Sequence, residues 1–292
     1  MSESDLKQVT IVSGKGGTGK TTTLASFAAL GQNKVIADCD VDASNLYLLM
    51  HPENNAQGEF IGAKVAVRDE ARCTRCGLCE EHCRFEAITV EAVDELACEG
   101  CGMCVVVCPE DALTLEPVVV GTWFTGVSAY GPMAHARLLP AAESSGRLVT
   151  LVRQKAEDLA YDYELPLILI DGPPGLGCTT TAALTETDLA IVVTEPSLSG
   201  IHDMERQVQL IEHFGLNAAV IINKCDLNAE NTQHLRAWCS WKGLPVLGEI
   251  PWDPQVTDAL MAKMPLVEHN DGQAAQAMRE TWERTAEMIA RL

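Results

Sequence analysis

A glycine-rich loop near the start of the chain has the spacing of a phosphate-binding site. Residues 9–23 read VTIVSGKGGTGKTTT: a β-branched apolar run, the complete G-x-x-x-x-G-K-[ST] pattern, and then residues that favour a helix. In such a loop backbone N–H groups turn towards phosphate oxygens, Lys20 can reach the β- and γ-phosphates, and Thr21 can ligate Mg²⁺. A plain glycine-rich turn would not need the strand before it and the helix after it. The expected phosphate-binding residues are Gly14, Lys15, Gly16, Gly17, Thr18, Gly19, Lys20, Thr21 and Thr22.

Eight of the 12 cysteines form two copies of a pattern that ligates iron–sulfur clusters. The pattern Cys-x2-Cys-x2-Cys-x3-Cys begins at Cys73 and again, 25 residues later, at Cys98. Three closely spaced thiolates can hold three corners of a [4Fe–4S] cube, and the fourth ligand comes from the other copy. Zinc would not need the third cysteine, and a disulfide scaffold is not expected in a cytosolic chain. The expected ligand sets are Cys73, Cys76 and Cys79 with Cys108, and Cys98, Cys101 and Cys104 with Cys83.

Carboxylates follow two apolar runs that read as buried strands. Asp38 and Asp40 follow a short run near the start of the chain, and Asp171 follows the LILI run at residues 167–170. In an open α/β sheet, ligands lie beyond the carboxyl ends of the strands, so these side chains are placed to approach Mg²⁺ or an attacking water.

The run KGGTGKTT resembles the deviant Walker A signature of the MinD/ParA/Mrp family of ATPases. The resemblance implies a doubly wound, mainly parallel α/β sheet and an ATP-sandwiched dimer, in which Lys15 reaches the phosphates of the partner. By position Asp40 matches the switch I aspartate that helps to order the attacking water, so Asp38 is expected to have a structural or indirect magnesium role. The D-G-P-P-G run from Asp171 matches the Walker B and switch II segment, so Gly175 is expected to present its N–H near the γ-phosphate. The expected catalytic residues are Lys15, Lys20, Asp40 and Asp171, and the expected magnesium ligands are Thr21, Asp40 and Asp171.

A second motif concerns the base of the nucleotide. The N-K-x-D run from Asn223 to Asp226 follows an apolar strand, and Pro251 opens a loop expected to pack beside the base. Guanine-specific NTPases use such an aspartate to accept hydrogen bonds from the base, whereas the MinD relatives use the asparagine for adenine. Four residues leave both bases open, and the complete KGGTGKT loop favours ATP.

The alternation of apolar strands and helices expected for the ATPase is interrupted by the cysteine repeat. We expect residues 1–58 and 118–292 to form the ATPase domain, and residues 59–117 to form an inserted α+β domain between the second and third core strands. The insert resembles a bacterial two-cluster ferredoxin, with Arg84 in place of the proline that usually follows the first copy. Residues 122–135 read only as a glycine- and aromatic-rich segment.

The charge balance excludes several partners. The chain has 292 residues and a formal net charge of −20, without a run of Lys or Arg that could bind nucleic acid or an anionic membrane. The N-terminal residues MSESDLKQ lack the features of a signal peptide, and no apolar stretch could span a bilayer. The C-terminal helix expected at residues 272–292 mixes Glu with Arg on its polar face, which favours packing on the domain over a membrane anchor. A cytoplasmic protein is expected.

Two kinds of chemistry in one chain suggest that they are coupled. We expect an ATP-hydrolysing switch, as a homodimer or a heterodimer with a related ATPase, that gates electron delivery from two [4Fe–4S] clusters to a redox or metallocofactor partner protein. An Mrp-type cluster carrier is an alternative, although eight ferredoxin-type cysteines favour clusters that stay bound. A spatial organiser of the MinD or ParA kind would leave the cysteines without a role. Cys178, just after the switch, could ligate a cluster across a dimer, but an apolar filler is the simpler interpretation.

Overall fold

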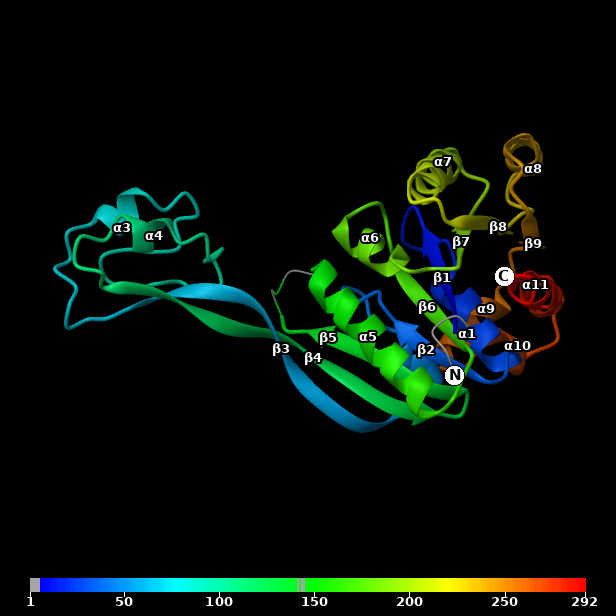
Figure 1. Ribbon diagram of the computed structural model, residues 1–292. Coiled ribbons are helices and arrows are strands. Elements are labelled where there is room, and N and C mark those ends of the chain that lie inside the picture. Colours follow the sequence, from blue (N-terminus) through cyan, green and yellow to red (C-terminus); the bar gives the residue numbers. More distant parts are fainter. Residues whose placement is uncertain (1–5, 141, 143–144) are drawn as a thin grey trace. The chain divides into compact units, whose positions relative to one another are not determined.

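The computed structural model describes residues 6–140, 142 and 145–292. Within these residues nine strands form one sheet in the order β3-β4-β5-β2-β6-β1-β7-β8-β9 (Figure 1). The strands are β1 (Lys7–Ser13), β2 (Lys34–Asp38), β3 (Glu53–Arg68), β4 (Leu113–Ser128), β5 (Gly131–Leu138), β6 (Leu167–Pro174), β7 (Leu189–Thr194), β8 (Asn217–Asn223) and β9 (Val246–Ile250). The helices are α1 (Lys20–Leu30), α2 (Tyr47–Met50), α3 (Leu78–Glu81), α4 (Met103–Val106), α5 (Gly146–Asp162), α6 (Cys178–Leu184), α7 (Leu198–His213), α8 (Ala229–Lys242), α9 (Gln255–Met261), α10 (Leu266–His269) and α11 (Gln273–Ile289).

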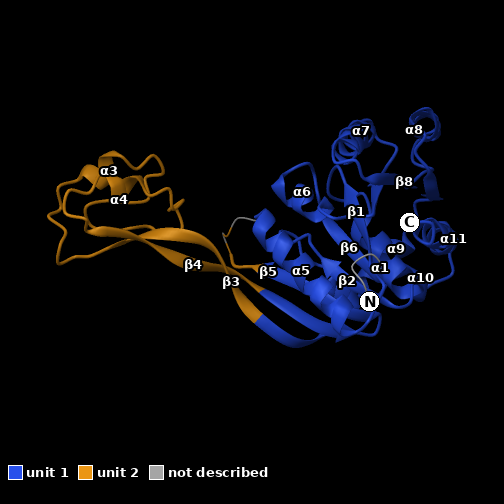
Figure 2. Ribbon diagram, viewed as in Figure 1, with its two compact units in different colours: residues 1–57, 123–137, 144–292 blue, residues 58–122, 138–143 orange. Residues whose placement is uncertain are grey.

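The chain divides into two compact units (Figure 2). Unit 1 comprises residues 1–57, 123–137 and 144–292, and unit 2 comprises residues 58–122 and 138–143. Strands β3 and β4 are each 16 residues long and belong partly to each unit. The sequence placed the limits of the insert at residues 59 and 117, next to the cysteine repeat, whereas both strands continue through those positions. The chain therefore enters and leaves unit 2 through β3 and β4.

The core of unit 1 is a parallel sheet of short apolar strands. β6 pairs in parallel with β1 and β2, and β5, β7, β8 and β9 extend the sheet in the same direction. Along β7 the side chains alternate between two apolar clusters: Ile191 packs with residues of α1 and α11, and Val192 with residues of α7 and α8. Helices therefore cover both faces, as parallel strands joined by helical crossovers require. The expected α/β fold with a mostly parallel sheet is confirmed.

The register of the sheet brings the predicted carboxylates to one edge. Asp38 of β2 is paired with Asp171 of β6, and Ser13 at the end of β1 is paired with Pro174. The carboxyl ends of these parallel strands lie at the same edge, so the loops that follow them are neighbours. The glycine loop after β1 and the acidic segment after β2 thus meet across β6.

The C-terminal helix α11 packs on unit 1 through its apolar face. Ala275 and Met278 are buried, and the Trp282 ring lies 5.1 Å from the Phe27 ring of α1. The apolar stripe predicted for this helix is thus in contact with the rest of the unit. Among the residues that the structure describes, no helix has both the length and the apolar character needed to cross a membrane.

Unit 2 repeats its backbone conformation as well as its sequence. The short helices α3 and α4 each follow a glycine with positive φ, 83° at Gly77 and 76° at Gly102. Arg75 and Gly100, which are equivalent positions of the repeat, also have positive φ. Five of the repeat cysteines, from both copies, pack against a small buried cluster made of Ala66, Ile88 and Leu113. The two copies therefore fold around one shared core.

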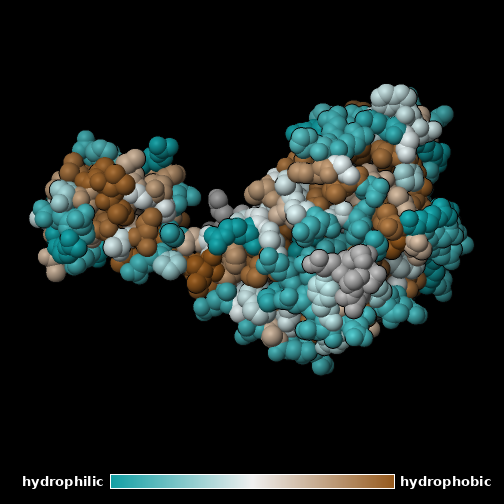
Figure 3. Space-filling model, viewed as in Figure 1, coloured by the Kyte–Doolittle hydropathy of each residue, from teal (hydrophilic) through white to brown (hydrophobic). Residues whose placement is uncertain are grey.

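The surface of unit 2 carries exposed apolar side chains. Leu96 and Val106 are each 82% exposed, and Phe85 and Met103 are 39% and 43% exposed. Hydrophobic residues gather on the face of unit 2 that Figure 3 shows. Exposed apolar surface of this kind is typical of sites where another protein docks.

Candidate functional sites

The glycine loop connects β1 to α1 in a conformation that depends on two glycines. Gly17 and Gly19 have φ values of +80° and +96°, a left-handed conformation that is costly for a residue with a Cβ. A Cβ at position 19 would collide with the side-chain amide of Asn223. That amide donates a hydrogen bond to the Thr18 carbonyl oxygen at 2.7 Å. Asn223, which the sequence assigned to the base, therefore holds the phosphate-binding loop in shape.

Gly19→Ala is expected to weaken Mg·ATP binding by at least about tenfold, because left-handed strain costs roughly 1–2 kcal/mol and the collision adds to it. Isothermal titration calorimetry with Mg·ATP measures the change. Gly16→Ala is the matched control within the same loop, because no atom lies within 4 Å of an added Cβ there, and its effect should be smaller. Equal losses in the two variants would show that the contact with Asn223 does not decide the loop conformation.

Lys20 lies in a buried cluster of charged groups. Its Nζ donates to Asp171 Oδ1 at 2.8 Å and to Asp40 Oδ2 at 3.1 Å, and Thr21 Oγ1 donates to Asp171 Oδ2 at 2.8 Å. Burial alone would lower the pKa of Lys20, but the Asp171 and Asp40 carboxylates raise it above its ordinary value, so the ammonium stays charged. The structure thus brings four of the predicted site residues into direct contact.

Asp38 is fully buried in the same region. It accepts hydrogen bonds from Ser44 Oγ at 2.9 Å and from the Asp40 backbone N–H at 3.3 Å. Burial and the neighbouring Asp171 carboxylate raise the pKa of Asp38 from its ordinary value of 3.8 to about 8. At neutral pH most of this carboxyl group is therefore protonated, which suits a structural role.

Asp38→Asn is expected to stabilise the chain, and to do so increasingly as the pH rises from about 5 to 8. In this window the unfolded carboxyl has lost its proton and the folded one has kept it, so unfolding of the wild type releases a proton and becomes easier with rising pH. The asparagine variant has no such proton to release. The difference between its free energy of unfolding and that of the wild type therefore grows by at most about 1.4 kcal/mol per pH unit. Thermal unfolding in EDTA across the window measures the difference, with Asp42→Asn at an exposed position as the control. A constant difference would show that Asp38 is ionised in the folded chain.

A cavity of about 610 Å³ lies over the glycine loop, a volume typical of small-molecule sites. Residues 16–22 and Asp40 line one part of it, and aliphatic side chains, among them Leu48 and Leu260, line another. Within the described part of the chain, Thr18 Oγ1 and Asp40 Oδ1 are buried oxygens without a hydrogen-bond partner. An unpaired carboxylate oxygen beside a phosphate-binding loop fits a hydrated Mg²⁺ ion with a polyphosphate. The donor set therefore suits a magnesium–nucleotide complex.

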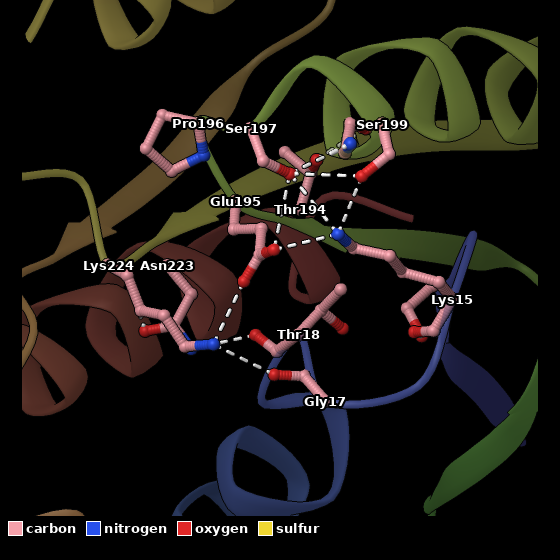
Figure 4. A network of polar contacts seen from close by, with 12 residues as sticks. Lys15, Gly17, Thr18, Thr194, Glu195, Pro196, Ser197, Ser199, Asn223 and Lys224 are labelled. Carbon is pink, nitrogen blue, oxygen red and sulfur yellow. Dashed lines mark hydrogen bonds and ion pairs between the residues drawn. The ribbon is translucent and has the colours of Figure 1, made fainter. Parts of the chain in front are cut away.

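Lys15 is held by acceptors of its own chain (Figure 4). Its Nζ lies 2.8 Å from Glu195 Oε1 and donates to Ser199 Oγ at 2.8 Å and to Ser197 Oγ at 3.2 Å. The second carboxylate oxygen of Glu195 accepts from Lys224 at 2.9 Å. Sequence reasoning gave Glu195 no role, although it directly follows the apolar strand β7. The strand-end signal that marked the other carboxylates would have found it.

The residues predicted to contact the base make contacts of their own. Asp226 Oδ1 accepts from the backbone N–H of Trp252 at 2.6 Å, directly after Pro251. The described residues that line the 610 Å³ cavity do not include Asn223, Asp226 or Pro251. The Gly175 N–H, predicted to face the γ-phosphate, donates to the Ser13 carbonyl at 2.9 Å. The structure therefore places Asn223 against the glycine loop and Gly175 against the end of β1, and it does not assemble a base site from Asn223, Asp226 and Pro251.

In unit 2 the eight repeat cysteines line two small pockets. The structure brings together the same two groups of four that the spacing predicts, with the fourth cysteine of each copy in the pocket of the other. Within the described residues, no three His, Cys, Asp or Glu side chains converge as ligands of a single metal ion. Four cysteines in each pocket are the number of protein ligands that a [4Fe–4S] cluster takes, and a structural zinc ion can take the same number. One pocket is lined by Cys73, Cys76, Cys79 and Cys108, and the other by Cys83, Cys98, Cys101 and Cys104.

The surroundings of the two pockets differ in charge. Arg68 and Arg75 line the first pocket together with Glu110, whereas Glu99 lines the second. Backbone N–H groups donate to one sulfur in each set, at 3.3 Å from Ala112 to Cys108 and at 3.5 Å from Ala66 to Cys98. Such donors and charges are among the factors that set cluster potentials. Cys178 lies outside both sets and is exposed at the first residue of α6 in unit 1.

Comparison with known proteins agrees with this geometry. The family described as CbiA, the CobQ/CobB/MinD/ParA nucleotide binding domain, matches residues 9–266. An uncharacterized protein of Methanocaldococcus jannaschii is 30% identical over 288 residues, which cover 97% of this chain and 98% of that protein. An uncharacterized ATP-binding protein of the same organism is 25% identical over 282 residues, covering 93% of this chain and 84% of that protein.

Solved structures show the same fold. The septum site-determining protein MinD of Pyrococcus horikoshii, complexed with Mg-ADP, is 20% identical and matches with a TM-score of 0.61 over 98% of this chain and 100% of that one. The family match includes the glycine loop, Asp40 and Asp171, which the structure places in one charged cluster. The chain therefore belongs to the CobQ/CobB/MinD/ParA nucleotide binding domain family and is a nucleotide-binding, MinD/ParA-like ATPase.

Proposed function

We propose that the chain is a Mg·ATP-dependent dimeric switch that couples its nucleotide state to electron delivery from two [4Fe–4S] clusters in unit 2. The observation that carries this proposal is that one chain contains both the buried Lys20–Asp171–Asp40 cluster and two pockets lined by four cysteines each. ATP hydrolysis alone would not need the cysteines, and a ferredoxin would not need the phosphate-binding loop. The electrons would serve a redox partner, or a protein whose metal–sulfur cofactor is being assembled.

In the nucleotide site each proposed role follows from position. Lys20 would exchange Asp171 and Asp40 for the β- and γ-phosphates, which leaves Thr21 and Asp171 free to hold Mg²⁺. Asp40 would orient the attacking water, and Lys15 would reach the phosphates bound by a second copy or a related ATPase. Mg²⁺, when bound, neutralises charge on the phosphoryl oxygens. The proposed base contacts are Asn223, Asp226 and Pro251.

In unit 2, which contains the proposed ferredoxin-like insert of residues 59–117, the cysteine thiolates would hold the two clusters, which supply one-electron redox capacity when bound. The pocket with Arg68 and Arg75 has more positive surroundings than the pocket with Glu99. A nearby cation favours the added electron. The cluster of Cys73, Cys76, Cys79 and Cys108 is therefore expected to be the easier one to reduce.

A direct covalent path joins the two proposed chemistries. The segment after Asp40 contains Ser44, which hydrogen-bonds Asp38, and then leads through α2 into β3. β3 begins at Glu53 in unit 1 and continues into unit 2. Rearrangement at Asp40 on phosphate cleavage could thus change the strand that enters unit 2, as in other nucleotide switches.

The surface chemistry of unit 2 suggests the kind of protein that it would dock. Residues 58–122 contain 13 Asp and Glu but only five Lys and Arg, and apolar side chains are exposed on the same unit. Opposite charge around an apolar centre steers association and sets orientation. The partner is therefore expected to present an apolar patch with a basic rim.

Anaerobic EPR of the reduced protein, recorded before and after addition of Mg·ATP and combined with an iron count, tests the proposal. About eight irons per chain and a signal that changes with Mg·ATP would support it. About eight irons with an ATP-independent signal would reject the coupling. Substoichiometric iron that transfers to an apoprotein would favour the Mrp-type carrier, and absence of iron would favour a spatial organiser.

A further inference from the structure

Glu195 pairs with two lysines through one carboxylate (Figure 4). Oε1 lies 2.8 Å from Lys15 Nζ and Oε2 lies 2.9 Å from Lys224 Nζ, and the Glu195 side chain is only 14% exposed. Burial alone would raise the pKa of Glu195, but Lys15 and Lys224 lower it to about 2. Glu195 is thus an anion at neutral pH, positioned between two cations.

The donors of the Lys15 ammonium are all engaged within its own chain. Besides Glu195, Ser199 Oγ accepts at 2.8 Å and Ser197 Oγ at 3.2 Å. A lysine ammonium has three N–H donors, so none remains for a phosphate while these contacts persist. Ser197 Oγ also lies 3.2 Å from Glu195 Oε1, to which it can donate. The acceptors of the Lys15 ammonium therefore lie around the start of α7. We call this intramolecular site, formed by Glu195, Ser197 and Ser199, the seat of Lys15.

Lys224 makes it possible for Lys15 to leave this seat. Its Nζ donates to the Gly17 carbonyl at 3.0 Å while it pairs with Glu195. A partly buried carboxylate that loses its only cation is left at a high desolvation cost. With Lys224 in place, Glu195 stays paired after Lys15 has gone. The ion pair between Glu195 and Lys15 can therefore hold Lys15 in place. It can also break without leaving Glu195 unpaired, because Lys224 remains.

We propose that Glu195 is a positioning residue that keeps Lys15 seated on its own protomer until Lys15 exchanges Glu195 for the phosphates of a second protomer. This inference rests on the ATP-dependent dimer proposed above. Phosphate oxygens form stronger charge-assisted hydrogen bonds than the hydroxyls of Ser197 and Ser199, so bound ATP favours the exchange. Glu195 thereby raises the concentration of Mg·ATP that dimerisation requires.

The seating of Lys15 can be tested in the full chain without nucleotide. Its rate of acylation by sulfo-N-hydroxysuccinimide acetate is followed by mass spectrometry of the Lys15 peptide. Glu195→Gln keeps the size of the side chain but removes its charge, and should speed acylation about two- to fivefold, as expected for loss of a partly exposed ion pair. Glu283→Gln, an equal charge change at an exposed position of α11, should leave the rate unchanged. An unchanged rate in Glu195→Gln overturns the seating.

The exchange is tested by sedimentation velocity across a titration with Mg·ATP. Glu195→Gln should dimerise at about two- to fivefold lower Mg·ATP than the wild type. An equal or higher requirement, with an unchanged Tm, overturns the threshold role. If Glu195→Gln does not fold, Ser199→Ala removes another acceptor of Lys15 and should shift both measurements in the same direction. If the wild type forms no dimer at saturating Mg·ATP, both the proposed dimeric switch and the exchange of Glu195 for phosphates are overturned. The pairing of Lys15 with Glu195 in the single protomer is decided separately, by the acylation rate alone.

Discussion

Lys20→Ala is expected to lower the free energy of unfolding by about 3–5 kcal/mol at neutral pH as well as to abolish ATP hydrolysis. The Lys20 ammonium pairs with Asp171 and Asp40 where none of the three side chains is more than 10% exposed. Without the ammonium, the buried carboxylates of Asp171 and Asp40 have no cation to pair with. The substitution also removes the positive charge that would contact the phosphates. Urea unfolding in EDTA measures the stability, and steady-state phosphate release should fall at least about a hundredfold.

A second substitution separates the two effects of losing Lys20. Asp171→Asn in the Lys20→Ala background removes one stranded carboxylate, so much of the stability should return while hydrolysis stays abolished. If Lys20→Ala alone were as stable as the wild type, the three side chains would not form a charged cluster in solution. The proposed exchange of carboxylates for phosphates would then lose its basis.

Cys83→Ser is expected to remove the same cluster as Cys101→Ser, although the two cysteines belong to different copies of the repeat. Both line the pocket that also contains Cys98 and Cys104. Serine does not supply the thiolate that such clusters use, so each variant should hold about four irons in place of about eight. Iron analysis after anaerobic reconstitution, together with EPR of the reduced protein, measures the loss and identifies the missing signal.

The control for this experiment is Cys178→Ser, an exposed cysteine of unit 1 that should leave the iron content unchanged. Cys76→Ser lies in the other pocket and should remove the signal that Cys83→Ser retains. If Cys83→Ser and Cys76→Ser lost the same signal, the ligand sets would not be crossed. Full iron content in Cys83→Ser would exclude that cysteine as a ligand.

The parts of the site that are contiguous or periodic were predictable from the sequence. The glycine loop needs only glycines, a lysine and a hydroxyl at fixed offsets. Asp40 and Asp171 could be placed together because apolar runs mark strands and parallel strands share an edge, and both lie within 3.1 Å of Lys20. The grouping of the cysteines followed from the spacing of the repeat.

Features that depend on distant contacts were not predictable in this way. β3 and β4 have 16 residues each, and few of them are buried, so these long strands carry little hydrophobic periodicity. Residues 122–135, which showed only glycine and aromatic enrichment, form the end of β4 and most of β5, which pairs with β2. The contact of Lys15 with Glu195 joins the ends of two strands far apart in sequence. The position of Glu195 directly after β7 marks it as a candidate site residue, but no local pattern specifies that it pairs with Lys15.

The crossed arrangement of the cysteines would affect how the proposed clusters are inserted. Each pocket takes three cysteines from one copy of the repeat and the fourth from the other, so neither copy completes a ligand set alone. On separate chains, two copies would have to meet in a bimolecular encounter. Tandem duplication makes the encounter intramolecular, with an effective concentration on the order of millimolar. In the wild-type chain, loading of one proposed cluster should therefore organise the other pocket, so that half-loaded chains are scarce during reconstitution unless a ligand has been substituted.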